Sequence, residues 1–158
     1  MTEVATRCFE SPIGNIYLEA RNNRVVALTM GGPKVENSGK ASVLDDAEKQ
    51  LKRYFSGKAK TLDFAVEVQG TDFQKEVWAQ IAAIPFGETK TYGEIAEAIG
   101  RPKAVRAVGG AVGANPVPLV IGCHRVLGAA GKITGYSGGD GLPTKRWLLA
   151  LEGLNAKE

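Results

Sequence analysis

The chain has 158 residues, enough for one ordinary domain or for two small domains that share a core. Hydrophobic residues make up 44% and charged residues 23%, which excludes a disordered composition, and the formal net charge of +3 is mild. No stretch approaches the roughly 20 apolar residues that span a bilayer, and the N-terminus lacks the basic start and apolar run of a signal peptide. We therefore expect a cytoplasmic protein that is not bound to a membrane.

The first part of the chain predicts a small antiparallel sheet followed by a helix. Three runs rich in β-branched and aromatic residues are separated by the turn signals SPIG and NN; they lie at 4–10, 15–21 and 25–30. Apolar residues then recur at helical spacing from Leu44 to Phe55, and Gly57 suits the position after a helix end. The segment TLDFAVEV predicts a short strand or an extended linker. We place the boundary near residues 66–70, between domains at 1–68 and 69–158.

The second part predicts mostly helices, so the fold class is α+β. The segments TDFQ at 71–74 and TYGE at 91–94 each fit a capping box, in which a threonine caps the helix and the fourth residue reaches back. The pattern predicts Pro102 in the first turn of the next helix, and a last helix between Pro143 and Gly153.

The two short helices joined by IGRP predict a helix-turn-helix whose second helix, AVRAVGGAVGA, has an unusual composition. Glycine inside a helix costs up to about 1 kcal/mol relative to alanine, so Gly109, Gly110 and Gly113 need a reason. One reason is close packing against a neighbouring helix. The other is close approach to DNA in the minor groove, with Arg106 filling the gap left by a displaced base. The absence of acidic residues between Ala98 and Gly139 favours a polyanionic partner.

Cys123 directly precedes His124, the single histidine of the chain. An imidazole that takes the thiol proton leaves a nucleophilic thiolate, but adjacent residues on a strand point to opposite faces. Proton transfer would then need a turn or a bridging water, and a carboxylate to hold the imidazole, either Asp140 or Glu152. The alternative is an inert buried cysteine in the apolar run PLVIGC. Only Cys8 and Cys123 are present, so we expect neither a disulfide framework nor a zinc site, and Cys8 is interpreted as a strand residue.

The segments GCHRVLGAAGKITGYSGG and RAVGGAVGANPVPLVIGCHRV resemble the active-site region of the O6-alkylguanine-DNA alkyltransferases, the methylated-DNA–protein-cysteine methyltransferases. The flanking segments FQKEVWAQIAAIPFGETKTYGEIA and KRWLLALEG are similar as well, so the resemblance covers essentially all of residues 71–154. It implies a ribonuclease-H-like N-terminal domain. It also implies single-turnover transfer of the alkyl group from O6-methylguanine, and from O4-methylthymine, to Cys123. No cofactor is implied, and the implied partner is duplex DNA bound as a monomer through its minor groove.

The resemblance also implies roles for individual residues. His124 would act as base through a water, Glu152 would orient His124, and Asn115 would brace the turn before the nucleophile. Tyr92 would help to rotate the nucleotide out of the helix and donate a proton, and Arg106 would replace the flipped base. Further DNA contacts and pocket residues are expected at Arg125, Lys103, Ala107 and Gly110, and at Pro118, Val126, Tyr136, Ser137 and Lys145.

One departure from the family pattern concerns Gly122, because the family has proline before the cysteine. Glycine is the most permissive residue, so we expect a looser loop and less precise attack geometry without loss of activity. The departure keeps open a recognition module that binds alkylated DNA with weak or no transfer. A cysteine hydrolase would leave the basic helix-turn-helix unexplained, and a DNA-regulatory protein would need a helix better suited to reading bases.

Overall fold

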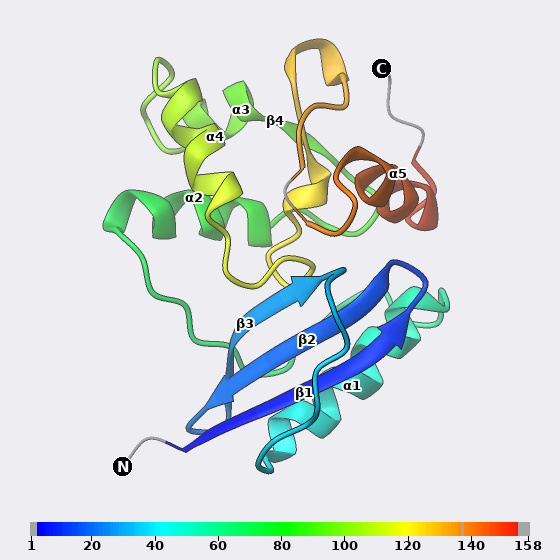
Figure 1. Cartoon of the computed structure of the whole chain (residues 1–158). Coiled ribbons are helices and arrows are strands. Elements are labelled where there is room, and N and C mark those ends of the chain that lie inside the picture. The colour runs from blue at the N-terminus through cyan, green and yellow to red at the C-terminus, as the bar shows by residue number, and fades with distance from the viewer. Residues whose placement is uncertain (1–2, 137, 155–158) are drawn as a thin grey trace.

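The computed structural model describes residues 3–136 and 138–154 and places a three-stranded sheet against the helical part of the chain (Figure 1). The sheet is antiparallel, as predicted, with neighbouring strands in the order β1 (Val4–Ser11), β2 (Gly14–Arg21) and β3 (Arg24–Met30). Asn22 and Asn23 form the turn between β2 and β3, with φ of 51° and 61°. Asparagine tolerates this left-handed region, which matches the twist of a two-residue hairpin.

Helix α1 (Ser42–Phe55) lies across one face of the sheet (Figure 1). Its fully buried residues Leu44 and Leu51 belong to the same core as Ile16 and Leu18 of β2. Burying each such side chain stabilises the fold by about 1.5–3 kcal/mol. The helix ends before Gly57, at φ 78°, as its sequence predicted.

The segment TLDFAVEV at 61–68 is an extended linker, one of the two predicted forms, and pairs with the sheet through the bridge between Val25 and Val66. Helices α2 (Asp72–Ala82) and α3 (Tyr92–Ala98) follow, and each begins with the complete predicted capping box.

Helix α4 (Val105–Gly113) begins three residues after Pro102. The prediction that Pro102 lies in its first turn was therefore wrong, because residues 102 and 103 form a separate turn closed by a hydrogen bond from Ala104 N–H to Arg101 O. The two helices of the predicted pair are nonetheless present. Trp78 Nε1 donates to Ala111 O at 2.8 Å, which fixes α4 against α2.

The C-terminal part contains two short 3-10 turns, η1 (Cys123–Arg125) and η2 (Ala129–Gly131), before helix α5 (Leu142–Leu151). Pro143 lies in the first turn of α5, as predicted, whereas Glu152 caps its C-terminal end instead of lying within it. A parallel pair, β4 (Lys90–Thr91) with β5 (Val126–Leu127), was not predicted, since strands of two residues have no readable periodicity.

The edge of β3 joins the sheet to both segments that flank Cys123. Leu28 N–H donates to Pro116 O at 2.9 Å, and Gly139 N–H donates to Met30 O at 3.1 Å. Backbone hydrogen bonds thus use an edge that would otherwise expose unpaired groups. Within the described ranges, no helix is long and apolar enough to cross a membrane.

Candidate active site

A tight turn presents Cys123. Cys123 N–H donates to Ile121 O at 2.7 Å, and Gly122 between them has φ −72° and ψ 64°, the geometry of an inverse γ-turn. Asn115 holds the same turn, because its Nδ2 donates to Ile121 O at 2.8 Å while its Oδ1 accepts from Val117 N–H at 3.0 Å. The turn explains how adjacent Cys123 and His124 serve one site without lying on an extended strand.

Gly122 occupies a backbone conformation that proline also adopts, since proline fixes φ near about −65°. A Cβ atom at this position would lie 3.1 Å from Arg125 Nη1, so a larger residue would press on the guanidinium. Glycine therefore makes room for Arg125 without requiring a conformation unavailable to proline.

His124 and Glu152 form a buried pair. His124 Nε2 lies 2.6 Å from Glu152 Oε2, and neither side chain is exposed. Arg125 adds two hydrogen bonds to the carboxylate, from Nε at 2.8 Å and from Nη2 at 2.9 Å, and its Nη1 donates to Ile84 O. Gly87 N–H donates to the same carboxylate at 3.0 Å. A buried charge requires several hydrogen-bond donors, because it has lost its hydrogen bonds to water.

These contacts determine the charge of the pair. Burial acts to raise the pKa of Glu152, but the hydrogen bonds from His124 and Arg125 outweigh it and hold that pKa well below its usual range. Burial lowers the pKa of His124, although Glu152 opposes the shift. A carboxylate therefore faces a neutral imidazole that donates through Nε2. Nδ1 is buried without a hydrogen-bond partner in the described part of the chain, which leaves a lone pair for an incoming proton.

The Cys123 thiol is itself buried, with 6% of the residue exposed. Burial raises its pKa, while Asn115, Tyr136 and the charge of Lys145 favour the thiolate. Lys145 is held by hydrogen bonds from Nζ to Val126 O at 2.7 Å and to Thr134 O at 3.1 Å, and burial lowers its pKa to about 8. Because burial keeps the thiol protonated, the site needs a base.

Cys123 contributes to two pockets. One of about 340 Å³ lies between α3, α4 and the loop before α5; its lining includes Tyr92, Gly109, Gly113, Cys123 and Tyr136. The other, of about 160 Å³, faces β3 and includes Asn115, Pro118 and Met30. The first has the volume for a small aromatic ring system, and two tyrosines border it.

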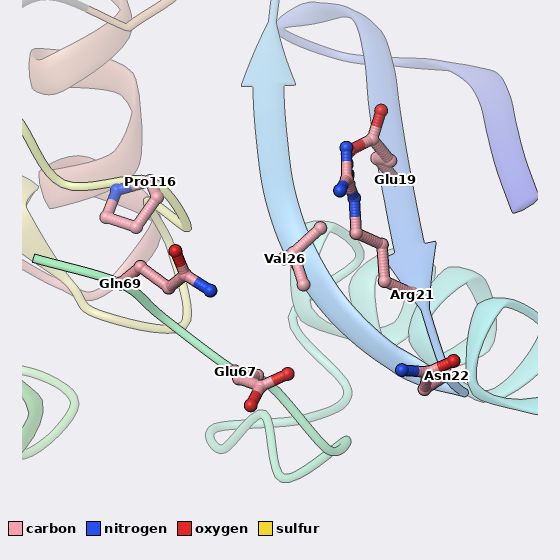
Figure 2. Close-up of a pocket in the computed structure, with 7 residues that line it drawn as sticks. All are labelled: Glu19, Arg21, Asn22, Val26, Glu67, Gln69 and Pro116. Carbon is pink, nitrogen blue, oxygen red and sulfur yellow. Dashed lines mark hydrogen bonds and ion pairs between the residues drawn. The ribbon is translucent and has the colours of Figure 1, made fainter. Parts of the chain in front are cut away.

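A third and larger pocket, of about 480 Å³, lies between β2, β3 and the linker (Figure 2). Figure 2 shows Arg21 beside Glu19 on the strands, with Gln69 and Pro116 on the opposite wall. None of the predicted site residues lines this pocket. Its size therefore does not make it the candidate active site.

The outer face of α4 is bare. Added Cβ atoms at Gly109, Gly110 and Gly113 would meet nothing within 4 Å apart from their own helix, so packing inside the molecule does not require these glycines. This finding contradicts the packing alternative, and close approach by DNA stays a prediction. Arg106 and Ala107 are exposed on the same helix.

Apart from Arg125, the predicted site residues separate into three groups. Those near Cys123 in the structure are His124, Glu152, Asn115, Val126, Tyr136, Lys145, Tyr92 and Pro118. Those exposed on α4 or just before it are Lys103, Arg106, Ala107 and Gly110. Ser137 lies outside the described residues.

Arg125 belongs to neither expected group. It was expected to contact DNA, but only 8% of the residue is exposed and its guanidinium is used by Glu152 and Ile84. This disagreement has a simple reason: the basic composition of the segment does not reveal which cation neutralises the buried carboxylate. Among the described residues, no group of three or more His, Cys, Asp or Glu side chains is arranged to hold a metal ion.

Two family models match the chain. The 6-O-methylguanine DNA methyltransferase DNA-binding domain matches residues 72–154, and the ribonuclease-like domain of the same family matches residues 4–68. The chain therefore belongs to the 6-O-methylguanine DNA methyltransferase family. Its members among the curated relatives carry the name methylated-DNA–protein-cysteine methyltransferase.

A relative of that name from Methanosarcina acetivorans is 46% identical over 151 residues, which cover 92% of this chain and 96% of the relative. The crystal structure of Mycobacterium tuberculosis O6-methylguanine methyltransferase is 42% identical, with a TM-score of 0.84, covering 95% of this chain and 93% of that one. A structure of the Mycobacterium tuberculosis protein in complex with DNA is 43% identical, with a TM-score of 0.83, covering 93% and 91%.

Proposed function

We propose that this protein repairs DNA by transferring the methyl group of O6-methylguanine, and of O4-methylthymine, irreversibly to its own Cys123. The observation that carries the proposal is the position of Cys123, in a pocket between Tyr92, Tyr136 and the glycine face of α4 and next in sequence to the buried His124–Glu152 pair. The names of the curated relatives support the same activity.

The chemistry is an in-line displacement. The Cys123 sulfur attacks the methyl carbon, a carbon–sulfur bond forms, and the carbon–O6 bond breaks with its electron pair moving onto the guanine. The thiol proton passes through a water to His124 Nδ1, the buried nitrogen that has a free lone pair. The guanine takes a proton from the Tyr92 hydroxyl, which is then replenished from solvent. The thioether has no route back to a thiol, so each molecule reacts once.

The other buried groups prepare this step. Glu152 fixes the imidazole through Nε2 and stabilises the positive charge that develops on it. Asn115 and Lys145 stabilise the thiolate, and Tyr136 forms a wall of the pocket. Glu152 acts on the positive charge that develops on the imidazole, while Asn115 and Lys145 favour formation of the thiolate that attacks; preorganised contacts to such charges contribute strongly to the rate.

DNA is bound through α4. A helix whose outer face has no long side chain apart from Arg106 suits the minor groove, which is only about 6 Å wide. Arg106 takes the place of the extruded base, while Lys103, Ala107 and Gly110 contact the backbone. The target base then reaches the buried thiol in the flipped conformation that such chemistry requires.

The protein acts as a monomer with two domains, at residues 1–68 and 69–158. The family models that match residues 4–68 and 72–154 support this division. A single molecule presents α4, the pocket and the thiol together, so the proposal needs no second copy. Size-exclusion chromatography with light scattering, with and without a duplex, measures the stoichiometry.

The test is intact-mass analysis after mixing the protein with a duplex that carries one O6-methylguanine, followed by peptide mapping. We expect a gain of one methyl group on Cys123, never more than one per molecule, and none in Cys123→Ala. Cys8→Ala is the matched control and should react normally. Selective binding to the damaged duplex without any mass gain would instead indicate a recognition module.

A further inference from the structure

Tyr54, at the end of α1, reaches from the N-terminal part of the chain into the buried pair. Its hydroxyl donates to Glu152 Oε2 at 2.6 Å, the same oxygen that lies 2.6 Å from His124 Nε2. The hydroxyl is also 3.4 Å from His124 Nε2. The hydroxyl, the imidazole and the carboxylate therefore form one cluster at Glu152 Oε2, which also accepts from Arg125 Nη2 at 2.9 Å, and the hydroxyl comes from outside the helical domain.

The position of the Tyr54 ring is closely fixed. Only 1% of the residue is exposed, and the ring makes edge contacts with Phe55 and Phe86 at centroid distances of 5.7 and 6.2 Å. Packing alone would be satisfied by phenylalanine at this position. The hydroxyl is therefore not required for packing of the core, and its hydrogen bond to Glu152 needs another explanation.

That hydroxyl remains a hydrogen-bond donor at every physiological pH. Burial raises the pKa of Tyr54 well above its usual value, and the charge of Glu152 adds to the shift. The phenol therefore always presents its proton to Oε2. Since each further donor to a carboxylate oxygen weakens its attraction for a proton, the phenol lowers the tendency of Glu152 to hold a proton on the imidazole.

We propose that Tyr54 is a positioning residue, whose hydroxyl fixes Glu152 Oε2 against His124 and keeps the imidazole neutral and ready to accept the proton of Cys123. The proposal rests on the proposed function, in which His124 is the base. Through this contact the N-terminal domain takes part in the reaction although it supplies none of the reacting atoms.

The remaining charged and titratable groups around the three do not replace the phenol. Arg125 faces the cluster from η1, Lys145 faces it from α5, and Tyr136 from the preceding loop. Arg125 already donates to both carboxylate oxygens. Removing the phenol would therefore leave Oε2 with one donor fewer and no nearby substitute.

The test exploits the single histidine of the chain, because the imidazole signals of the untagged protein then need no assignment. In Tyr54→Phe we expect the His124 pKa, measured by nitrogen-15 NMR, to rise by about one unit relative to the unmodified chain. The acid limb of the methyl-transfer rate should move to higher pH by the same amount, measured by rapid quench between pH 4.5 and 8.5.

Tyr17→Phe is the matched control, because the Tyr17 hydroxyl also interacts with a glutamate, Glu19, but on the sheet and away from the site. It should leave both readouts unchanged. A Tyr54→Phe variant that reacts more slowly by one factor at all pH values, with an unchanged imidazole titration, would show a purely structural role and overturn the proposal. Coincidence of both readouts with those of the unmodified chain would overturn it too.

The test remains informative if the variant does not fold or if the proposed function is wrong. If thermal unfolding shows that Tyr54→Phe does not fold, 3-fluorotyrosine can be placed at this position instead. It has nearly the same shape but a more acidic phenol, which donates a stronger hydrogen bond to Glu152. The His124 pKa should then fall. If the unmodified chain transfers no methyl group, the proposed function fails. The imidazole titration still reports whether Tyr54 acts on His124, so the two failures are distinguishable.

Discussion

The region around Cys123 and the outer face of α4 are built in opposite ways. Around Cys123, buried polar groups converge on one another, and Glu152 alone accepts from His124, Arg125, Tyr54 and the Gly87 N–H. On α4, the glycines have no neighbour within 4 Å of an added Cβ. The first region is determined by contacts within the chain, and the second leaves room for a partner. Substitutions in the first should thus alter folding and chemistry together, whereas those in the second should weaken DNA binding without destabilising the fold.

Glu152→Gln should have the largest effect, because it removes the charge to which His124, Arg125, Tyr54 and the Gly87 N–H all donate. We expect the transfer rate to fall by about 10²–10⁴-fold and the free energy of unfolding by about 3–5 kcal/mol. Rapid-quench kinetics and urea unfolding measure the two. A variant that loses activity with unchanged stability would contradict the linkage of chemistry to folding in this region.

Arg106→Ala tests the role of the outer face of α4. We expect duplex repair to slow by about 10–100-fold, since no side chain then fills the gap left by the flipped base, a loss of about 1.4–2.8 kcal/mol. A single-stranded substrate has no such gap, so its repair should change little. Lys132→Ala, which removes another exposed cation outside α4, is the control. Equal losses on both substrates would assign Arg106 a purely electrostatic role.

Gly110→Gln should separate binding from folding. A side chain on the bare face should weaken duplex binding by about tenfold, measured by fluorescence anisotropy, because it keeps the helix from the groove. The same change should raise the free energy of unfolding by up to about 1 kcal/mol, since glycine is the poorer helix former. Reduced stability would mean that the helix interior, not a partner, requires this glycine.

The buried pair predicts how stability depends on pH. The pKa of His124 is lowered on folding, so below about pH 6.5 the unfolded chain binds a proton that the folded chain does not. Stability should therefore fall by about 1.4 kcal/mol per pH unit as the pH drops through that window. Glu152, whose pKa is also lowered, adds a second loss below about pH 4.3. A free energy of unfolding, measured in urea, that stays constant between pH 7.5 and 5.5 would contradict the effect expected from His124.

Gly122→Pro should have the smallest effect. The φ of −72° already suits proline, and Gly122 N–H makes no hydrogen bond within the described residues. The gain from a stiffer unfolded chain, up to about 1 kcal/mol, is offset by pressure on Arg125 Nη1. We expect a transfer rate within about threefold of the unmodified chain. A tenfold acceleration would mean that the turn is loose, as the departure from the family pattern first suggested.

Local patterns predicted more of this molecule than long-range contacts did. The capping boxes at Thr71 and Thr91 were readable because all of their atoms lie within four residues. Pro102 misled because a turn competes with the helix for the same residues. The spacing that placed Tyr54 on the buried face of α1 carries no information about its hydroxyl, whose partner Glu152 is 98 residues away.

The burial of Cys123 also affects how long an unused molecule remains competent. Peroxides and disulfides react with exposed thiolates, whereas this thiol is 94% hidden and burial raises its pKa. Cys8, half-buried on the sheet, is the more accessible thiol and can be oxidised without loss of the acceptor. For a protein that acts once, the number of molecules whose thiol remains reduced equals the number of lesions that can still be repaired.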